Sequence, residues 1–281
     1  MQINCGPYSF DLTTTDPAVI HNAKLIYGDA PATDSVTDFT IALQPGSWLR
    51  RKIKPQVSFR CDQHAPFKPL PLSQAYALLE WGMNWCIAAH EYSRFLLHAA
   101  VLVKNDQAII CPALPGSGKS TLSAYLGLSG WSVYSDEMAI IDIDSQQVLP
   151  LFRPVCLKNN SISLLRSWHP SAIVTPVCRD TQKGDVAHVK VLNWKQYQQL
   201  KPVAITALVF PKYQADAALT IYQLDQLDAF GQLSRNAFNY NVLGETAFDI
   251  VADIVPRAGL YQVEYSELTE LASFFDELVQ P

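Results

Sequence analysis

The chain has 281 residues, of which 49% are hydrophobic and 17% are charged, and its formal net charge is −5. This composition is that of a globular protein and excludes a disordered chain. The acidic balance argues against broad nucleic-acid binding, which usually needs a basic surface, but it leaves room for a local basic pocket around a triphosphate.

Cysteines and apolar segments indicate the cellular environment. The six cysteines are scattered and form no CxxC pair, so we expect reduced, buried thiols rather than a zinc site or a disulfide framework. The N-terminal residues lack the basic and apolar pattern of a secretory signal. Apolar runs are interrupted within about ten residues, against the roughly 20 that a spanning helix needs. We therefore expect a cytoplasmic protein without a membrane partner.

Residues 1–70 are expected to form a β-rich N-terminal subdomain. Residues 39–44 and 56–61 alternate as strands do, with proline and glycine between them. The proline-rich residues 66–71 fit neither a helix interior nor a central strand, and they mark the boundary of a second domain over residues 71–281. This domain opens with apolar residues at helical spacing over 73–92, which predict an amphipathic helix with Ser73 as its cap.

The second domain mixes predicted strands and helices. Residues 96–103 and 108–111 are predicted strands joined by a hairpin turn at 104–106. A helix is expected from Lys119 to about Leu128, with Gly130 at its end. Further strands are expected at 131–135, 139–143, 206–210 and 219–224, and further helices at 229–240, 244–253 and 267–278. This order favours an α/β (α+β) fold with a mixed sheet.

Residues 113–120 carry the clearest motif. They read Ala-Leu-Pro-Gly-Ser-Gly-Lys-Ser and fit the P-loop pattern, with alanine where glycine is commoner at the first position. Two glycines let the backbone curl so that its N–H groups face phosphate oxygens, and the helix that follows adds its positive end. The lysine reaches the outer phosphates and the serine hydroxyl binds Mg²⁺. The expected nucleotide-binding residues are Pro115, Gly116, Ser117, Gly118, Lys119, Ser120 and Thr121, with ATP and Mg²⁺ as cofactors.

An acidic pair follows the predicted strand 131–135. Asp136 and Glu137 end this strand as the P-loop ends another, so both motifs can face one crevice. We expect Asp136 to bind Mg²⁺ together with Ser120, and either acid to act as the catalytic base. The preceding strand is short and partly polar, which is not typical of motor or transporter ATPases. His98 lies within an apolar strand, where a histidine is more often a core residue.

The stretch from Leu97 to Glu137 resembles the catalytic domain of HPr kinase/phosphorylase, a bacterial serine kinase. The matching pieces are Leu97-His98, Gly116-Ser-Gly-Lys-Ser120, Gly130 and Asp136-Glu137. The resemblance implies an HPr kinase/carboxykinase-like P-loop core with Lys119, His98 and the acidic pair at the active site. One acid would accept the proton of the incoming hydroxyl. Because Glu137 stands where those kinases have aspartate, either acid remains a candidate.

Most of residues 80–240 is similar, more specifically, to the group called HPr kinase-related kinase A. Its landmarks are Glu80-Trp-Gly-Met-Asn84, Leu97-His-Ala-Ala100, Pro115-Gly-Ser-Gly-Lys-Ser-Thr121, Ser135-Asp-Glu137, Arg153-Pro-Val-Cys-Leu-Lys-Asn159, Asp180-Thr-Gln-Lys-Gly184 and Ala237-Phe-Asn-Tyr240. Genes of this group often lie near one for a small peptide-chaperone protein. The resemblance therefore implies a peptide or protein as phosphate acceptor.

Three cations in loop-like contexts are further candidates. Phosphoryl transfer spreads negative charge over the transferring oxygens, and nearby cations stabilise it. Arg153, Lys158 and Lys183 are therefore candidate phosphate or acceptor contacts, with solvated surface charge as the alternative for each.

The sequence leaves three functions open. The first is a kinase that transfers the γ-phosphate of ATP to a hydroxyl, as of a serine in a peptide or protein. The second is a nucleotide-gated module that binds a peptide or protein without substantial turnover. The third is a kinase acting on a small molecule, in line with the carboxykinase-like core. No nucleic-acid partner is expected, and a homo-oligomer stays open.

Overall fold

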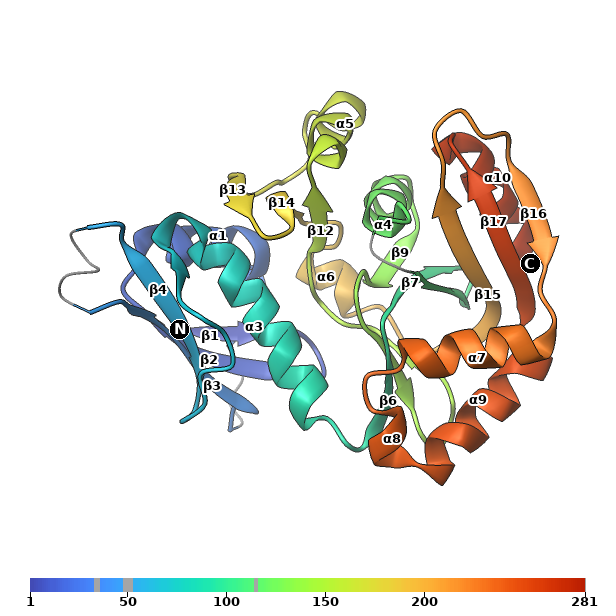
Figure 1. Cartoon of the computed structure of the whole chain (residues 1–281), viewed down its shortest axis with the longest axis horizontal. Coiled ribbons are helices and arrows are strands. Elements are labelled where there is room, and N and C mark those ends of the chain that lie inside the picture. Colours follow the sequence, from blue (N-terminus) through green and yellow to red (C-terminus); the bar gives the residue numbers. More distant parts are fainter. Residues whose placement is uncertain (33–35, 48–52, 114–115, 281) are drawn as a thin grey trace. The chain divides into compact units, whose positions relative to one another are not determined.

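The computed structural model describes residues 1–32, 36–47, 53–113 and 116–280 (Figure 1). The chain forms two compact units, the first made of Met1–His90 with Cys156–Lys195 and the second of Glu91–Val155 with Gln196–Pro281. Helices accompany mixed sheets, as expected for an α/β protein. Within the described ranges, no helix has both the length and the apolar character needed to cross a membrane.

The first unit contains a five-stranded sheet. Its order is β1 (Gln2–Asn4), β2 (Ser9–Thr14), β3 (Phe39–Pro45), β4 (Gln56–Cys61) and β5 (Leu70–Pro71), and only β2 and β3 run parallel. The strands predicted at 39–44 and 56–61 are therefore confirmed. The proline-containing β5 lies at the sheet edge, where a missing N–H donor is tolerated.

Two helices complete this part of the first unit. Helix α1 (Pro17–Tyr27), which was not predicted, forms the crossover between β2 and β3. Helix α3 (Ala75–His90) follows a 3-10 turn, η1 (Leu72–Gln74), and confirms the helix predicted over 73–92. The predicted cap is wrong, because Ser73 lies inside the 3-10 turn. It is tied to α1 by the buried carboxylate of Glu80, which accepts hydrogen bonds from the hydroxyls of Tyr27 at 3.0 Å and Tyr76 at 2.5 Å.

The rest of the first unit comes from later in the chain. It holds a three-stranded sheet in the order β12 (Val155–Lys158), β14 (Gly184–Val189) and β13 (Cys178–Thr181), together with α5 (Asn160–Trp168). The chain leaves the first unit after Lys195, within the short helix α6 (Trp194–Tyr197). The sequence predicted none of these elements. The first unit thus contains residues 1–70, helix α3 and a segment more than 60 residues further along the chain.

The second unit is built on a six-stranded sheet. Its order is β16 (Thr220–Gln223), β17 (Gly259–Tyr265), β15 (Ala204–Tyr213), β8 (Gln107–Pro112), β7 (Ala99–Lys104) and β9 (Ser132–Ser135). Strands β17, β15 and β8 are parallel. Strand β7 is antiparallel to both β8 and β9, so β9 points the same way as β8. The ends of β8, β9, β15 and β17 therefore share one edge of the sheet.

The predicted hairpin between β7 and β8 is confirmed. Asn105 and Asp106 adopt φ values of 52° and 57° at the turn, which is the left-handed conformation that a two-residue hairpin loop requires. The turn leaves β7 and β8 in register from Lys104–Gln107 to Ala99–Pro112. This register fixes where the start of β7 lies relative to the end of β8.

A second small sheet and five helices surround the six strands. The sheet has the order β11 (Val148–Leu149), β10 (Ala139–Asp142) and β6 (Arg94–Leu97), and the helices are α4 (Lys119–Leu128), α7 (Gln226–Asn236), α8 (Tyr240–Leu243), α9 (Glu245–Arg257) and α10 (Leu268–Leu278). Figure 1 shows α7 and α9 side by side. The helix predicted over 229–240 is wrong at its end, because Ala237 is extended and forms a bridge with Leu97.

The core of the second unit lies mainly between the sheet and helices α7 and α9. It combines the strand residues Ile110 and Leu208 with the helix residues Leu233, Val251 and Ile254. Helix α10 packs on the opposite face, where the rings of Tyr261 and Phe274 lie 5.4 Å apart. Helices therefore pack on both faces of the sheet.

Candidate functional site

The glycine-rich segment, residues 113–120, follows strand β8 and runs into the start of helix α4. Gly116 and Gly118 have φ values of 91° and 86°, a left-handed conformation that glycine adopts at little cost. Helix α4 opens with a hydrogen bond of 3.0 Å from the Leu122 N–H to the Gly118 carbonyl. Leu114 and Pro115 lie outside the described residues. The strand and helix expected on either side of this segment are confirmed.

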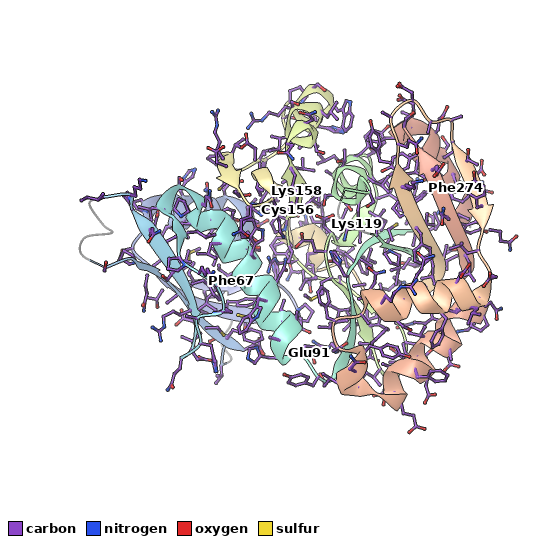
Figure 2. The ribbon with its side chains drawn as sticks, viewed as in Figure 1. Phe67, Glu91, Lys119, Cys156, Lys158 and Phe274 are labelled. Atoms are coloured by element: carbon purple, nitrogen blue, oxygen red, sulfur yellow. The ribbon has the colours of Figure 1, made fainter. Side chains whose placement is uncertain are left out.

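Lys119, which Figure 2 labels, is the first residue of helix α4. Its side chain is only 8% exposed. A cation at the positive end of a helix is unfavourable by itself, so this arrangement suits an anion nearby. Burial raises the pKa of the Cys111 thiol to about 12, even though the positive charge of Lys119 acts to lower it. Cys111 is therefore a neutral thiol at the end of β8. All six cysteines are buried free thiols, as expected.

Two tyrosines that sequence reasoning missed hold the glycine-rich segment. The Tyr213 N–H donates to the Ser117 carbonyl at 3.1 Å, and the Tyr265 hydroxyl donates to the same oxygen at 3.4 Å. Their rings lie 5.8 Å apart at an angle of 75°. These residues end β15 and β17, which run parallel to β8, so only the strand order reveals their role.

The acidic pair occupies a tight turn between β9 and β10. The Ser135 hydroxyl accepts a hydrogen bond of 2.9 Å from the Met138 N–H and closes this turn. Asp136 is 4% exposed, whereas Glu137 is partly exposed. Since β9 points the same way as β8, the turn lies at the sheet edge from which the glycine-rich segment departs.

His98 lies opposite this acidic turn, but not within a continuous strand. The strand predicted over 96–103 is wrong, because the chain breaks at His98 into β6 and β7, which belong to different sheets. Strand β6 pairs Leu97 with Ala139, and β7 pairs Val101 with Ser135. This register places residues 98–100 opposite residues 136–138.

The start of β7 also lies beside the glycine-rich segment, because Ala99 pairs with Pro112 at the end of β8. The His98 N–H donates to the Asn236 carbonyl at 2.7 Å, and its ring lies 5.7 Å from that of Phe238. Three separate segments therefore meet at one edge of the sheet: the loop before α4, the break at His98 and the acidic turn.

Asn239 holds the chain that leads to His98. Its side-chain oxygen accepts from the Leu96 N–H at 3.0 Å, and its side-chain amide donates to the carbonyls of Glu91 and Arg94 at 3.2 and 2.7 Å. The residue is 2% exposed. It belongs to the sequence landmark 237–240, and that landmark was the only signal for it in the sequence.

The remaining candidates are distributed over both units. Ser120 and Thr121 lie in the first turn of α4 and are partly exposed. Arg153 is partly buried in the second unit, and its backbone N–H donates to the Leu151 carbonyl at 3.0 Å. Lys158 ends β12 and Lys183 is exposed, both in the first unit. The ammonium of Lys183 lies 5.1 Å from the centre of the Trp81 ring, a cation–π contact.

The residues at the sheet edge offer oxygen ligands for a hard cation. In the part of the chain that the structure describes, no three His, Cys, Asp or Glu side chains form a metal cluster. Mg²⁺ in phosphate sites needs fewer protein ligands, since it is bound by one or two protein oxygens together with phosphates and water. The hydroxyl of Ser120 and the carboxylate of Asp136 are ligands of that kind.

Neither the protein-family models nor the curated proteins contain a match to this chain.

Proposed function

We propose that this protein is an ATP-dependent phosphotransferase of the HPr kinase-like type. The observation that carries the proposal is the strand register, which brings the glycine-rich segment, His98 and Asp136–Glu137 to one sheet edge. A phosphate-binding loop beside a carboxylate pair is the arrangement that phosphoryl transfer from a triphosphate to a hydroxyl requires.

The glycine-rich segment would hold the triphosphate. The left-handed conformations of Gly116 and Gly118 are of the kind that lets backbone N–H groups face phosphate oxygens. The ammonium of Lys119 and the positive end of α4 offset the charge of the outer phosphates. This part of the site works by binding and orienting ATP, with no covalent step of its own.

The carboxylates would act on the acceptor. The oxygens of Ser120 and Asp136 would hold Mg²⁺, which would supply positive charge beside the phosphates. Asp136 or Glu137 takes the proton of the acceptor hydroxyl while the hydroxyl oxygen forms a bond to the γ-phosphorus. The bond from that phosphorus to the bridging oxygen breaks, and the electron pair leaves with ADP. His98, across from the acidic turn, orients the carboxylate or the phosphate.

The acceptor we propose is a serine hydroxyl in a peptide or protein. The support is the resemblance of most of residues 80–240 to HPr kinase-related kinase A, a group whose genes often lie near one for a small peptide-chaperone protein. Arg153, which belongs to the same unit as the glycine-rich segment, is proposed as a contact to the phosphates or the acceptor.

Transfer of label from γ-labelled ATP tests the proposal. The protein is incubated with Mg²⁺, labelled ATP and proteins and peptides from the same cell. Lys119→Ala should lower labelling by about 100-fold or more, because it removes a charge that stabilises the transferring phosphate. Lys104→Ala is the matched control, since Lys104 lies at the far end of β7, where it pairs with Asp276 at 2.7 Å.

Equal labelling by the wild type and Lys119→Ala would contradict the proposal. Tight ATP binding by the wild type without transfer to any protein, peptide or small molecule would instead identify a nucleotide-gated binding module. Label on a small molecule alone would keep the kinase and replace its acceptor class.

A further inference from the structure

The order of the six-stranded sheet separates the surroundings of the glycine-rich segment into two sides. On one side of β8 lie β7 and β9, with His98 and the acidic turn at their ends. On the other side lie β15 and β17, which end in Tyr213 and Tyr265. Adjacent strands are about 4.8 Å apart, so the two sides are distinct in space.

This asymmetry gives a bound triphosphate a direction. Under the proposed function, on which this inference rests, the γ-phosphate points to the carboxylates beside β9. The lysine of a P-loop contacts the outer phosphates, and its backbone holds the inner ones. The nucleoside must therefore extend away from the acidic turn, across the segment toward the ends of β15 and β17.

Tyr213 has the properties of a stacking platform at that place. Its side chain is 49% exposed although its backbone is bonded to the Ser117 carbonyl. The ring of Tyr265, which is 1% exposed, meets it nearly edge-on and limits its movement. An aromatic ring that is both exposed and held in place loses little conformational entropy when it binds a flat partner.

The backbone beyond Tyr213 is also held close to β17. The Gln214 N–H donates to the Tyr265 carbonyl at 2.9 Å, and the Ser266 hydroxyl donates to the Ala217 carbonyl at 2.8 Å. These bonds fix the connection after β15 next to the glycine-rich segment. The exposed ring therefore keeps a constant position relative to the phosphate-binding backbone.

We propose that Tyr213 stacks on the nucleobase of the bound nucleoside triphosphate. Stacking on an aromatic side chain accepts any base, because every base has a π face. The platform therefore contributes affinity for the purine of ATP and discriminates weakly between ATP and GTP. Tyr265 is the positioning residue that holds the platform.

Calorimetric titration with two probes tests the assignment. One probe is ATP with Mg²⁺, and the other is inorganic tripolyphosphate with Mg²⁺, which has the phosphates without the base. Tyr213→Ala should weaken ATP binding by about tenfold and leave tripolyphosphate binding unchanged. Tyr213→Phe should keep the affinity for ATP, because the ring remains.

Tyr222→Ala is the control, because Tyr222 is also 49% exposed but lies on β16 opposite Gln262, away from the glycine-rich segment. If Tyr213→Ala leaves ATP binding unchanged, or weakens both probes equally, the platform assignment is wrong and the proposed function stands. If the wild type binds neither probe, both are overturned.

Discussion

The hydroxyl oxygen of Tyr265 lies only 2.3 Å from the position that a Cβ atom at Gly118 would occupy. No real Cβ atom tolerates such a contact, so residue 118 is restricted to glycine by its neighbour as well as by its φ of 86°. The phosphate-binding backbone and the end of β17 are therefore packed against each other with no space for a side chain.

Gly118→Ala should disrupt the glycine-rich segment more than Gly116→Ala does. Both carry the cost of a left-handed alanine, about 1–2 kcal/mol, but a Cβ atom at Gly116 meets nothing within 4 Å. We expect Gly118→Ala to abolish ATP binding in a calorimetric titration, whereas Gly116→Ala weakens it only moderately. Adding Tyr265→Phe to Gly118→Ala should restore part of the stability of the folded protein, since it removes the atom closest to the new Cβ. Equal effects of Gly118→Ala and Gly116→Ala on ATP binding would refute this packing.

Asp136→Asn and Glu137→Gln should separate metal binding from proton transfer. The variant that removes the catalytic base is expected to lower phosphoryl transfer by about 100-fold or more, because general-base catalysis contributes about 10²–10⁴-fold. Asp136→Asn should in addition raise the Mg²⁺ concentration needed for half-maximal activity, because a carboxamide is a weaker Mg²⁺ ligand. Turnover measured across a Mg²⁺ series checks this. An unchanged Mg²⁺ requirement in Asp136→Asn would remove Asp136 from the metal site.

Asn239→Ala should destabilise the second unit by about 2–3 kcal/mol. It leaves the Leu96 N–H and the carbonyls of Glu91 and Arg94 without the bonds that the buried amide supplies. Urea unfolding measures the change. Asn239→Asp is the matched variant, because it keeps the acceptor for Leu96 but places a carboxylate against two carbonyls. Wild-type stability in both variants would show that Asn239 does not hold β6.

The buried thiol of Cys111 predicts a loss of stability at high pH. Its pKa rises from 9.0 to about 12 on folding, so above pH 9 the unfolded chain releases a proton that the folded chain keeps. This contribution is present in full below pH 9 and is lost as the pH rises toward 12, at about 1.4 kcal/mol per pH unit. Urea unfolding at pH 8, 9 and 10 measures it.

Cys111→Ala is the control for this pH dependence. The variant should be less stable at pH 8, because it leaves a cavity, yet its stability should fall less steeply between pH 9 and 10. Burial also raises the pKa of Tyr134 and Tyr265, so the variant should still lose some stability at alkaline pH. Equal slopes in the wild type and the variant would show that the Cys111 thiol is not held neutral.

Several elements followed from short stretches of sequence. The hairpin at Asn105–Asp106, the helix that begins at Lys119 and the stop at Gly130 depend on backbone preferences that act over a few residues. Helix α1 carried similar signals and was missed. Asp16 caps it by accepting the Ala18 N–H at 2.8 Å, and a proline stands at its first position.

Other features could not be read from local patterns. The apolar run 96–103 looks like one strand, but long-range pairing divides it at His98, where the chain changes sheets. Asn239 lies more than 140 residues from the carbonyls that it binds. The three-stranded sheet of the first unit lies far along the chain from the five-stranded sheet of the same unit.

The sequence by itself determined the glycine-rich segment with its flanking strand and helix, because glycine conformations and helix starts are local properties. It also indicated the acidic pair as the end of a strand. Only the tertiary structure decided that β15 and β17 lie on one side of β8 and β7 and β9 on the other. Strand order depends on which apolar faces are buried against one another, and the strands concerned lie far apart in the chain. Their order is therefore decided only when the whole unit folds.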